Sequence, residues 1–206
     1  MLAMRRIAFL TRLILGLACF AALAARADEI EVRSAILRPT EGGLVLDADF
    51  AFELTPRLAD VAANGVPLYF RVDFELTRPR WYWFDETTAT SRLQLRLSYH
   101  ALSRQYRLST GLLQQNFATL EEALNVLKRV RNWLVVDRSV SLSGGDYEAA
   151  VRMRHDTSML PKPFQLSALT GRELHLESSW RRFTAHALAQ APAPVESREL
   201  PGAPAR

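Results

Sequence analysis

The sequence predicts a mainly β protein, an antiparallel β-sandwich of about seven to nine strands with one packed amphipathic helix and a short second helix. Two observations support this fold class. Apolar and polar side chains alternate along several segments, as they do in strands that bury only one face. Because buried parallel strands are apolar on both faces, one-sided alternation favours antiparallel sheets that pack face to face.

The predicted strands follow one another along most of the chain. Alternation is clearest over residues 44–54, 68–77, 92–99 and 147–154, the last of which follows the turn residues Gly144-Gly145-Asp146. Shorter candidates are residues 30–37, 106–109, 133–136 and 174–180. The sequence contains no internal repeat, so we expect one domain.

A short helix is predicted over residues 56–63, as a crossing between two strands. Thr55 is a suitable N-cap, Pro56 is favoured at the first helical position, and Asn64-Gly65 is a typical helix stop.

The amphipathic helix is expected to begin after Thr119, which forms a capping box with Glu122. Five apolar residues then share one helical face: Leu120, Ala123, Leu124, Leu127 and Val130. Basic residues at its end suit the helix dipole: Lys128, Arg129 and Arg131. We expect this helix to cover an open edge or end of the sandwich.

Residues 1–27 have the three parts of a cleavable signal peptide. After a positively charged start, residues 13–23 are apolar but too few to span a bilayer. Ala25-Arg26-Ala27 then predicts cleavage before Asp28, which leaves a mature chain without a transmembrane span. Two alternatives stay open, an uncleaved anchor and a lipoprotein acylated at Cys19.

The remaining chain divides into a sandwich-like domain, residues 28–184, and a tail, residues 185–206. The tail is rich in Ala, Pro, Glu and Arg and has no periodicity, so it is expected to be disordered.

The charge balance excludes a general nucleic-acid binder. The whole chain has 26 Lys and Arg against 22 Asp and Glu. Four of the arginines, and no acid, lie in residues 1–27, so the mature chain has 22 charges of each sign. A phosphate-binding surface needs a surplus of positive charge, and none is left. The only cysteine, Cys19, also lies in the signal, so no disulfide is expected.

Four segments resemble a family of exported Gram-negative proteins, the domain of unknown function 4390. They are Arg80-Trp81-Tyr82-Trp83-Phe84-Asp85-Glu86, Tyr106-Arg107-Leu108-Ser109, Phe117-Ala118-Thr119-Leu120-Glu121-Glu122-Ala123-Leu124 and Asp156-Thr157-Ser158-Met159-Leu160-Pro161-Lys162-Pro163-Phe164-Gln165. With Trp180 they cover about residues 28–183. The resemblance implies a periplasmic, envelope-facing domain with no activity or catalytic residues to carry over. Genes of this family often lie beside a sensor kinase, which implies a link to envelope signalling.

The aromatic run Trp81, Tyr82, Trp83 and Phe84 is the first candidate contact surface. In an extended segment alternate rings face opposite sides, so one pair is expected to join the core and the other to stay exposed. The exposed pair, together with Arg80, would contact a partner. The alternative is that the rings only complete the core and rim of the sandwich.

A second candidate contact segment consists of Pro161, Lys162, Pro163, Phe164 and Gln165. Two prolines remove backbone donors, which argues against a helix interior and a central strand. We expect an ordered extended loop, anchored by Phe164 or by the leucine after Gln165. It would be either a docking loop or a rigid crossover between the last strands.

Three acids, Asp47, Asp49 and Glu53, project from one face of a predicted strand. A calcium site needs more oxygen ligands converging from a loop. We therefore expect these acids to pair across strands with basic residues such as Arg71.

No catalytic residue, metal ligand or cofactor is predicted. The histidines lack metal-ligand spacing: His100, His155, His175 and His186. The chain has no H-E-x-x-H, G-x-S-x-G, P-loop or G-x-G-x-x-G motif. His155-Asp156 and Ser158 are triad residue types, but sequence neighbours rarely provide the geometry of a triad.

These observations predict a non-catalytic periplasmic interaction module that binds an unidentified envelope protein through residues 80–84 and 161–165. Its role would be in signalling with a sensor kinase. The alternative is a carrier that holds a glycan or lipid in a groove between sheet and helix. A third alternative is an envelope hydrolase. Nothing in the sequence indicates the oligomeric state.

Overall fold

The computed structural model describes residues 30–79, 86–142, 146–165 and 172–185. The strands in this part of the chain are β1 (Glu31–Thr40), β2 (Gly43–Ala51), β3 (Leu68–Arg78), β4 (Glu86–His100), β5 (Gln105–Thr110), β6 (Leu113–Phe117), β7 (Arg129–Asp137), β8 (Glu148–His155) and β9 (Arg181–Thr184). The helical elements are α2 (Pro56–Ala63), α3 (Leu120–Leu127) and the 3-10 turns η1 (Thr157–Met159) and η2 (Arg172–Leu174).

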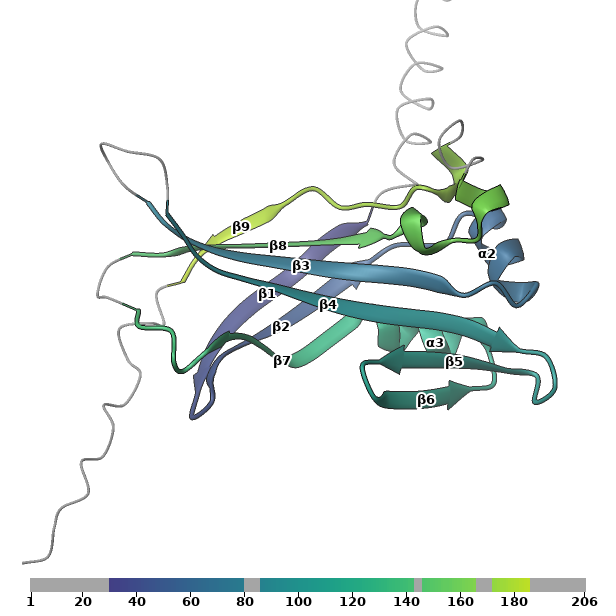
Figure 1. The fold of residues 1–206 in the computed structure, drawn as a ribbon, viewed down its shortest axis with the longest axis horizontal. Coiled ribbons are helices and arrows are strands. Elements are labelled where there is room, and N and C mark those ends of the chain that lie inside the picture. The colour runs from purple at the N-terminus through teal and green to yellow at the C-terminus, as the bar shows by residue number, and fades with distance from the viewer. Residues whose placement is uncertain (1–29, 80–85, 143–145, 166–171, 186–206) are drawn as a thin grey trace, which may run out of the picture.

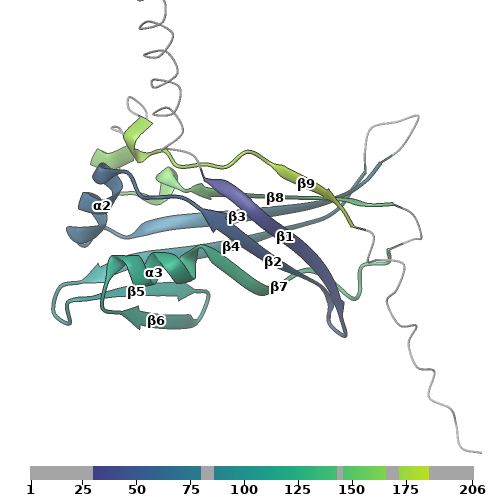
Figure 2. The same cartoon turned by 180° about the vertical axis from the view of Figure 1, so that it is seen from behind.

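The strands form two antiparallel sheets, which confirms the predicted fold class. The smaller sheet has the order β1-β2-β7, and the larger has the order β6-β5-β4-β3-β8-β9. Figures 1 and 2 show the smaller sheet lying obliquely across one face of the larger sheet. Strand β3 is central in the larger sheet and pairs with β4 on one side and with β8 on the other.

The core fills the space between the two sheets. Every second residue of β3 points into it, and these side chains are at most 1% exposed: Leu68, Phe70, Val72, Phe74 and Leu76. Leu46 and Ala48 of β2 are fully buried and belong to the same cluster. The opposite face of β3 is therefore the outer face of the larger sheet, because side chains alternate along a strand.

Hydrogen bonds tie the smaller sheet to the larger one at both of its edges. The Ser91 hydroxyl in β4 donates to the Val135 carbonyl in β7 at 2.7 Å. At the other edge, Arg181 Nη1 donates to the Val32 carbonyl in β1 at 3.2 Å. In each edge strand of the smaller sheet, a backbone carbonyl is thus hydrogen-bonded within the fold. This reduces the number of backbone groups that could pair with a strand of another chain.

The short helix α2 forms over the predicted residues. The Thr55 hydroxyl accepts from the Leu58 N–H at 3.2 Å and donates to the Glu173 carbonyl at 2.6 Å. It therefore caps the helix and joins it to η2. Gly65, at φ +82°, takes the left-handed conformation that ends the helix.

Helix α3 begins where predicted but ends earlier. The Glu122 N–H donates to the Thr119 hydroxyl at 3.2 Å, and the Glu122 carboxylate accepts from the Ala118 N–H at 3.1 Å. The expected helical face extended to Val130, yet this residue lies in β7, pairs with Ala48 and is 4% exposed. For Val130, pairing with β2 and burial in the core together outweigh its fit to the helical pattern.

Two further differences concern the ends of the larger sheet. The segment 174–180 is not the predicted strand: η2 ends at Leu174, Glu177 forms one isolated bridge with Arg154, and the last strand is β9. Strand β6 was not predicted. It is an edge strand with four of its five residues exposed, so it has no buried face to produce alternation.

Several predictions fall outside the described residues. These are the signal peptide of residues 1–27 and the tail beyond residue 185. Ala185 itself is 4% exposed, and its N–H donates to the Tyr147 carbonyl at 2.9 Å, so the fold includes it. Within the described part of the chain, no helix is long and apolar enough to cross a bilayer.

Candidate functional site

A cluster of charged side chains covers the centre of the outer face of the larger sheet. Asp73 projects from the middle of β3 onto this face. Directly opposite it stand Arg92 in β4 and Arg152 in β8. Two residues further along these strands, Arg71 pairs with Arg154, and both side chains project from the same outer face. The sheet register therefore brings four arginines from three strands to one carboxylate.

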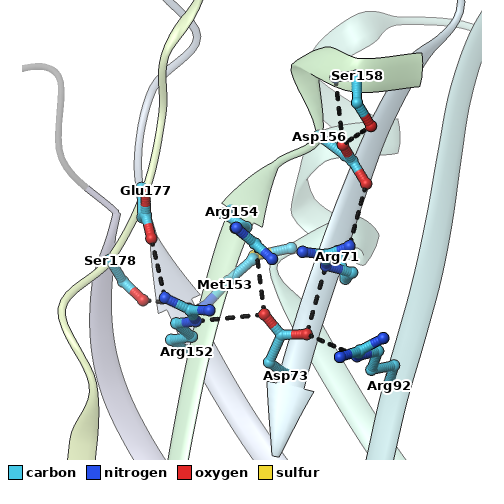
Figure 3. Close-up of polar contacts among 10 residues, drawn as sticks. All are labelled: Arg71, Asp73, Arg92, Arg152, Met153, Arg154, Asp156, Ser158, Glu177 and Ser178. Atoms are coloured by element: carbon cyan, nitrogen blue, oxygen red, sulfur yellow. Dashed lines mark hydrogen bonds and ion pairs between the residues drawn. The ribbon is translucent and has the colours of Figure 1, made fainter.

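The four guanidinium groups approach both oxygens of Asp73 through their Nε atoms (Figure 3). Arg71 and Arg92 lie 3.3 and 3.7 Å from Oδ1. Arg152 and Arg154 lie 3.2 and 3.3 Å from Oδ2. The Asp73 side chain is only 8% exposed, because the arginine stems cover it. We call these five residues the arginine cluster.

Two further carboxylates border the arginine cluster. Asp156 Oδ2 lies 3.4 Å from Arg71 Nη1, and Glu177 Oε1 lies 3.2 Å from Arg152 Nη1. Four cations thus meet three anions, which leaves a formal charge of +1. In the described part of the chain, Arg92 and Arg154 have no carboxylate partner besides Asp73.

The arginine cluster has more hydrogen-bond donors than acceptors. The Nε atoms of Arg71 and Arg154 are buried and make no hydrogen bond, although both lie at ion-pair distance from Asp73. Each guanidinium has five N–H donors in a rigid fork that matches a carboxylate or phosphate. The Arg92 side chain is 77% exposed and presents its donors to solvent. This arrangement can bind an anion through charge-assisted hydrogen bonds.

Trp180 connects the arginine cluster to the edge of the sandwich. The Arg152 guanidinium carbon lies 4.5 Å from the centre of the Trp180 ring, a cation–π geometry. Beside this pair, the Met153 N–H donates to the Ser178 hydroxyl at 2.9 Å, which fixes the segment between η2 and β9 against β8.

Trp180 also lines an open groove of about 1090 Å³. The groove lies where β1, β2, α3 and the segment before β9 meet. Its charged and polar lining residues are Glu31, Arg33, Ser34, Asp49, Glu53, Asn125, Lys128, Arg129, Ser179 and Arg181, and its apolar ones are Ile30, Val32, Phe50, Ala51, Phe52 and Trp180.

Only one of the two contact segments predicted from the sequence lies among the described residues. Arg80, Trp81, Tyr82, Trp83 and Phe84 lie outside the described residues. The strand ends that flank them, Arg78 and Glu86, pair with each other at one end of the larger sheet.

The proline-containing segment lies at the other end of that sheet (Figure 1). Thr77 pairs with Glu148 at the first end and Phe70 with His155 at the second. Seven residues along a strand correspond to about 23 Å. The strand ends that flank residues 80–84 are therefore about this far from the end that carries the proline-containing segment.

The prediction of an extended loop at Pro161–Gln165 was wrong, because residues 162–165 form a helical turn. The N–H groups of Phe164 and Gln165 both donate to the Pro161 carbonyl, at 2.9 and 3.2 Å. Pro163 lies in the first turn of a helix, where a backbone N–H has no helical partner in any case, so proline is tolerated there.

The side chains of this turn divide between the core and the solvent. Phe164 is half-buried and packs against the core. The Gln165 amide donates to the carbonyls of Ser158 and Leu160 at 2.7 and 2.6 Å. Pro161, Lys162 and Pro163 are exposed.

Asp47 and Asp49 do pair with arginines, but not with Arg71 as expected. Asp47 Oδ2 lies 2.6 Å from Arg38, and Asp49 binds Arg131. Arg71 is out of reach because β2 and β3 belong to different sheets. The pKa of Asp47 is lowered mainly by the hydrogen bond that it accepts from the Asn132 N–H. The pKa of Asp49 is lowered mainly by its hydrogen bond with the Arg131 side chain.

His155 is the one histidine in the described chain that is buried. Its Nδ1 lies 2.8 Å from the Leu174 carbonyl, and its ring centre lies 5.4 Å from that of Phe70. Burial lowers the pKa of His155. The described residues contain no group of three or more metal-ligating side chains.

Comparison with known proteins gives one match. The family described as "Domain of unknown function (DUF4390)" matches residues 27–184. Neither the curated proteins nor the solved structures give a match.

Proposed function

Since the chain belongs to the DUF4390 family, whose description names no activity, we propose a function from the site itself. We propose that this protein is a non-catalytic interaction module of the periplasm. It binds an acidic segment of another envelope protein on the outer face of the larger sheet. Transmission of an envelope signal to a sensor kinase is part of this proposal.

The arginine cluster is the observation that carries the proposal. One buried carboxylate holds four guanidinium groups in place, so their side chains lose less freedom on binding than free surface arginines would. Guanidinium groups bind carboxylates bidentately, and arginine is enriched at interface hot spots. The negative charges of an acidic segment would complement the net positive cluster.

The neighbouring outer-face residues extend the same surface along β4 and β5. Arg96 lies over the Tyr69 ring at 5.9 Å, and Arg107 Nε donates to the Asn116 side chain at 3.2 Å. Both arginines keep terminal donors for a ligand. The surface is thus a strip of ordered cations rather than a single charge.

A labelled polyglutamate peptide tests this function directly. The double variant Arg92→Gln, Arg154→Gln removes two charges from the arginine cluster, and we expect it to weaken binding about tenfold or more. The control Arg57→Gln, Arg138→Gln removes the same charge from exposed sites elsewhere. Fluorescence anisotropy at low and physiological ionic strength measures both. Equal weakening by both variants would show non-specific attraction and end the proposal.

A photo-crosslinking residue at Gln94 tests the surface in cells. Gln94 is exposed and lies opposite Arg71 on the outer face. We expect it to capture a protein whose crosslinked peptide is acidic, and Arg92→Gln, Arg154→Gln should abolish the product. The same residue at Arg57, on α2, is the control. Products that persist in the double variant would contradict binding at this face.

The periplasmic location has its own test. We expect the intact mass of the protein purified from the periplasm to correspond to a chain that begins at Asp28. A mass that includes a lipid on Cys19 would instead show a membrane-anchored form.

A further inference from the structure

We infer that the groove beside Trp180 is a binding site for an oligosaccharide. The inference does not depend on the protein partner proposed above, although Arg152 of the arginine cluster packs on Trp180. It rests on the size of the groove, on the chemistry of its lining and on the position of one aromatic ring.

The size of the groove suits a ligand of several sugar units. Its volume of about 1090 Å³ lies just above the usual range of ligand sites, which measure about 300–1,000 Å³. It is formed by a sheet, a helix and a connecting segment. The bonds of Arg181 to Val32 and of Ile30 to Glu177 join the sheet to the connecting segment, and the Phe50 N–H donates to the Lys128 carbonyl at the end of α3 at 2.9 Å. The walls are therefore held in place without a ligand.

The lining does not suit a lipid chain. Four of its six apolar residues, Ile30, Val32, Phe50 and Phe52, are at most 7% exposed, so they form the floor but offer little surface. The side chains that reach the groove are largely charged or polar. An acyl chain would have to displace water from these groups without replacing their hydrogen bonds, which is costly.

The charge of the lining favours a ligand that is neutral overall. Three acids and four basic residues are interspersed around the groove, so no single sign dominates. Glu31 and Arg33 lie 4.0 Å apart, which is an example of this mixture. Carboxylates accept from hydroxyl groups, whereas guanidinium and ammonium groups donate to them. A polyol such as a sugar satisfies both kinds of group at once.

Trp180 supplies the platform that a pyranose ring requires. Its ring is half-buried, and the Arg152 guanidinium covers one face at 4.5 Å. That contact fixes the ring without using its whole surface. The apolar face of a sugar would pack on the part of the ring that lines the groove.

Glu53 and Asn125 are the polar residues best placed to choose among sugars. Both line the groove and are exposed, and neither side chain forms a hydrogen bond or ion pair within the described part of the chain. Their oxygens and amide hydrogens are free for ligand hydroxyl groups. Glu53 lies in the connection after β2 and Asn125 lies in α3, so the two residues border the groove from different segments.

The test is a titration of the mature protein with soluble oligosaccharides, followed by NMR or calorimetry. The probes are cellotetraose, chitotetraose and maltotetraose. We expect at least one to bind in the millimolar range or tighter. Glu53→Gln and Asn125→Ala should each weaken that binding about threefold to tenfold, and Trp180→Ala should abolish it.

Matched variants separate a sugar site from a general loss of structure. Gln94→Ala and Asn116→Ala, which lie on the outer face of the larger sheet, should leave sugar binding unchanged. Glu53→Gln and Asn125→Ala touch only exposed groups and should keep the wild-type melting temperature, which covers the case in which Trp180→Ala does not fold. Failure of all three sugars to bind would overturn the inference, as would binding that Glu53→Gln and Asn125→Ala do not alter. Neither result affects the polyglutamate assay.

Discussion

Asp73 and Arg152 stand directly opposite each other on β3 and β8, and Arg152 Nε lies 3.2 Å from Asp73 Oδ2. The same carboxylate contacts three more arginines, so its removal leaves four guanidinium groups with only Asp156 and Glu177 to pair with two of them. The function proposed for this face depends on that carboxylate, because it is what holds the guanidinium groups together.

We therefore expect Asp73→Asn to destabilise the fold by about 2–4 kcal/mol. Removing one partner of a buried ion pair costs about 3–5 kcal/mol, and the solvent exposure of Arg92 lowers the cost here. Glu75→Gln on the same face is the control and should change stability by less than about 0.5 kcal/mol. Urea unfolding measures both. A combined Asp73→Asn, Arg152→Gln variant should cost less than the sum of its parts, and strict additivity would argue against coupling.

The sequence predicts only part of this outer face, because the face also depends on which strands pair and in which register. The alternation of Tyr69, Arg71, Asp73 and Glu75 correctly placed all four on one side of a strand. Arg152 and Arg154 were assigned to one face of another strand in the same way. Alternation does not show which strands pair with each other. Without it, Arg71 was expected beside Asp47 and Asp49, which belong to the other sheet.

The helices show the same contrast. Features that depend on neighbouring residues were predicted, and features that depend on residues distant in sequence were not. Thr55, Pro56 and Gly65 specify the ends of α2 through local chemistry, and the structure confirms them. The end of α3 was predicted too late because Val130 suits both a helical face and a strand. Pro163 was taken as evidence against a helix interior and hence for an extended loop, although the first turn of a helix tolerates proline. A groove between sheet and helix was only an alternative, and its lining residues could not be predicted, since its walls come from segments as distant as Glu31 and Trp180.

The buried His155 predicts a dependence of stability on pH. Its Nδ1 must carry the hydrogen that is donated to the Leu174 carbonyl, which leaves Nε2 as a buried acceptor without a partner in the described chain. Burial, aided by His175, lowers the pKa of His155 below its usual 6.5, whereas Leu174 and Asp156 oppose this. Below pH 6.5 the unfolded state therefore binds more protons than the folded state, so stability falls as the pH falls.

His155→Gln isolates this contribution. The amide of glutamine retains a donor for the Leu174 carbonyl but does not titrate. We expect the wild type to lose more stability than the variant between about pH 7.5 and about pH 5.5 in urea unfolding. The exposed His100→Gln should behave as the wild type. Parallel losses in wild type and His155→Gln would assign the pH dependence to other groups.

The two threonine caps should differ in their effect on stability. Thr55 is 6% exposed and bonds to both the Leu58 N–H and the Glu173 carbonyl, whereas the exposed Thr119 caps only α3. Loss of a cap costs about 1 kcal/mol, and an unpaired buried carbonyl adds about 1–3 kcal/mol. We expect Thr55→Ala to cost about 2–3 kcal/mol and Thr119→Ala about 1 kcal/mol, measured by urea unfolding. Equal costs would show that the bond to Glu173 contributes nothing.

Gly43 is a position where any side chain should prevent the close approach of β2 to β7. Its φ of +133° is one that residues with a Cβ rarely adopt, and a Cβ there would lie 2.1 Å from the Val136 carbonyl oxygen. Gly111, at φ +57°, has a positive φ but no atom within 4 Å of the Cβ position. Substitutions at Gly43 and Gly111 therefore distinguish the cost of a positive φ from the cost of steric overlap.

We expect Gly111→Ala to cost about 1–2 kcal/mol, the usual penalty for a left-handed residue. Gly43→Ala should cost well above about 3 kcal/mol, because the carbonyl it meets is backbone and cannot move without breaking the pairing of Gly43 with Asp137. Thermal unfolding of both variants measures the difference. Similar melting temperatures would mean that β2 and β7 separate at low cost, which would place the edge of the smaller sheet among the least stable parts of the fold.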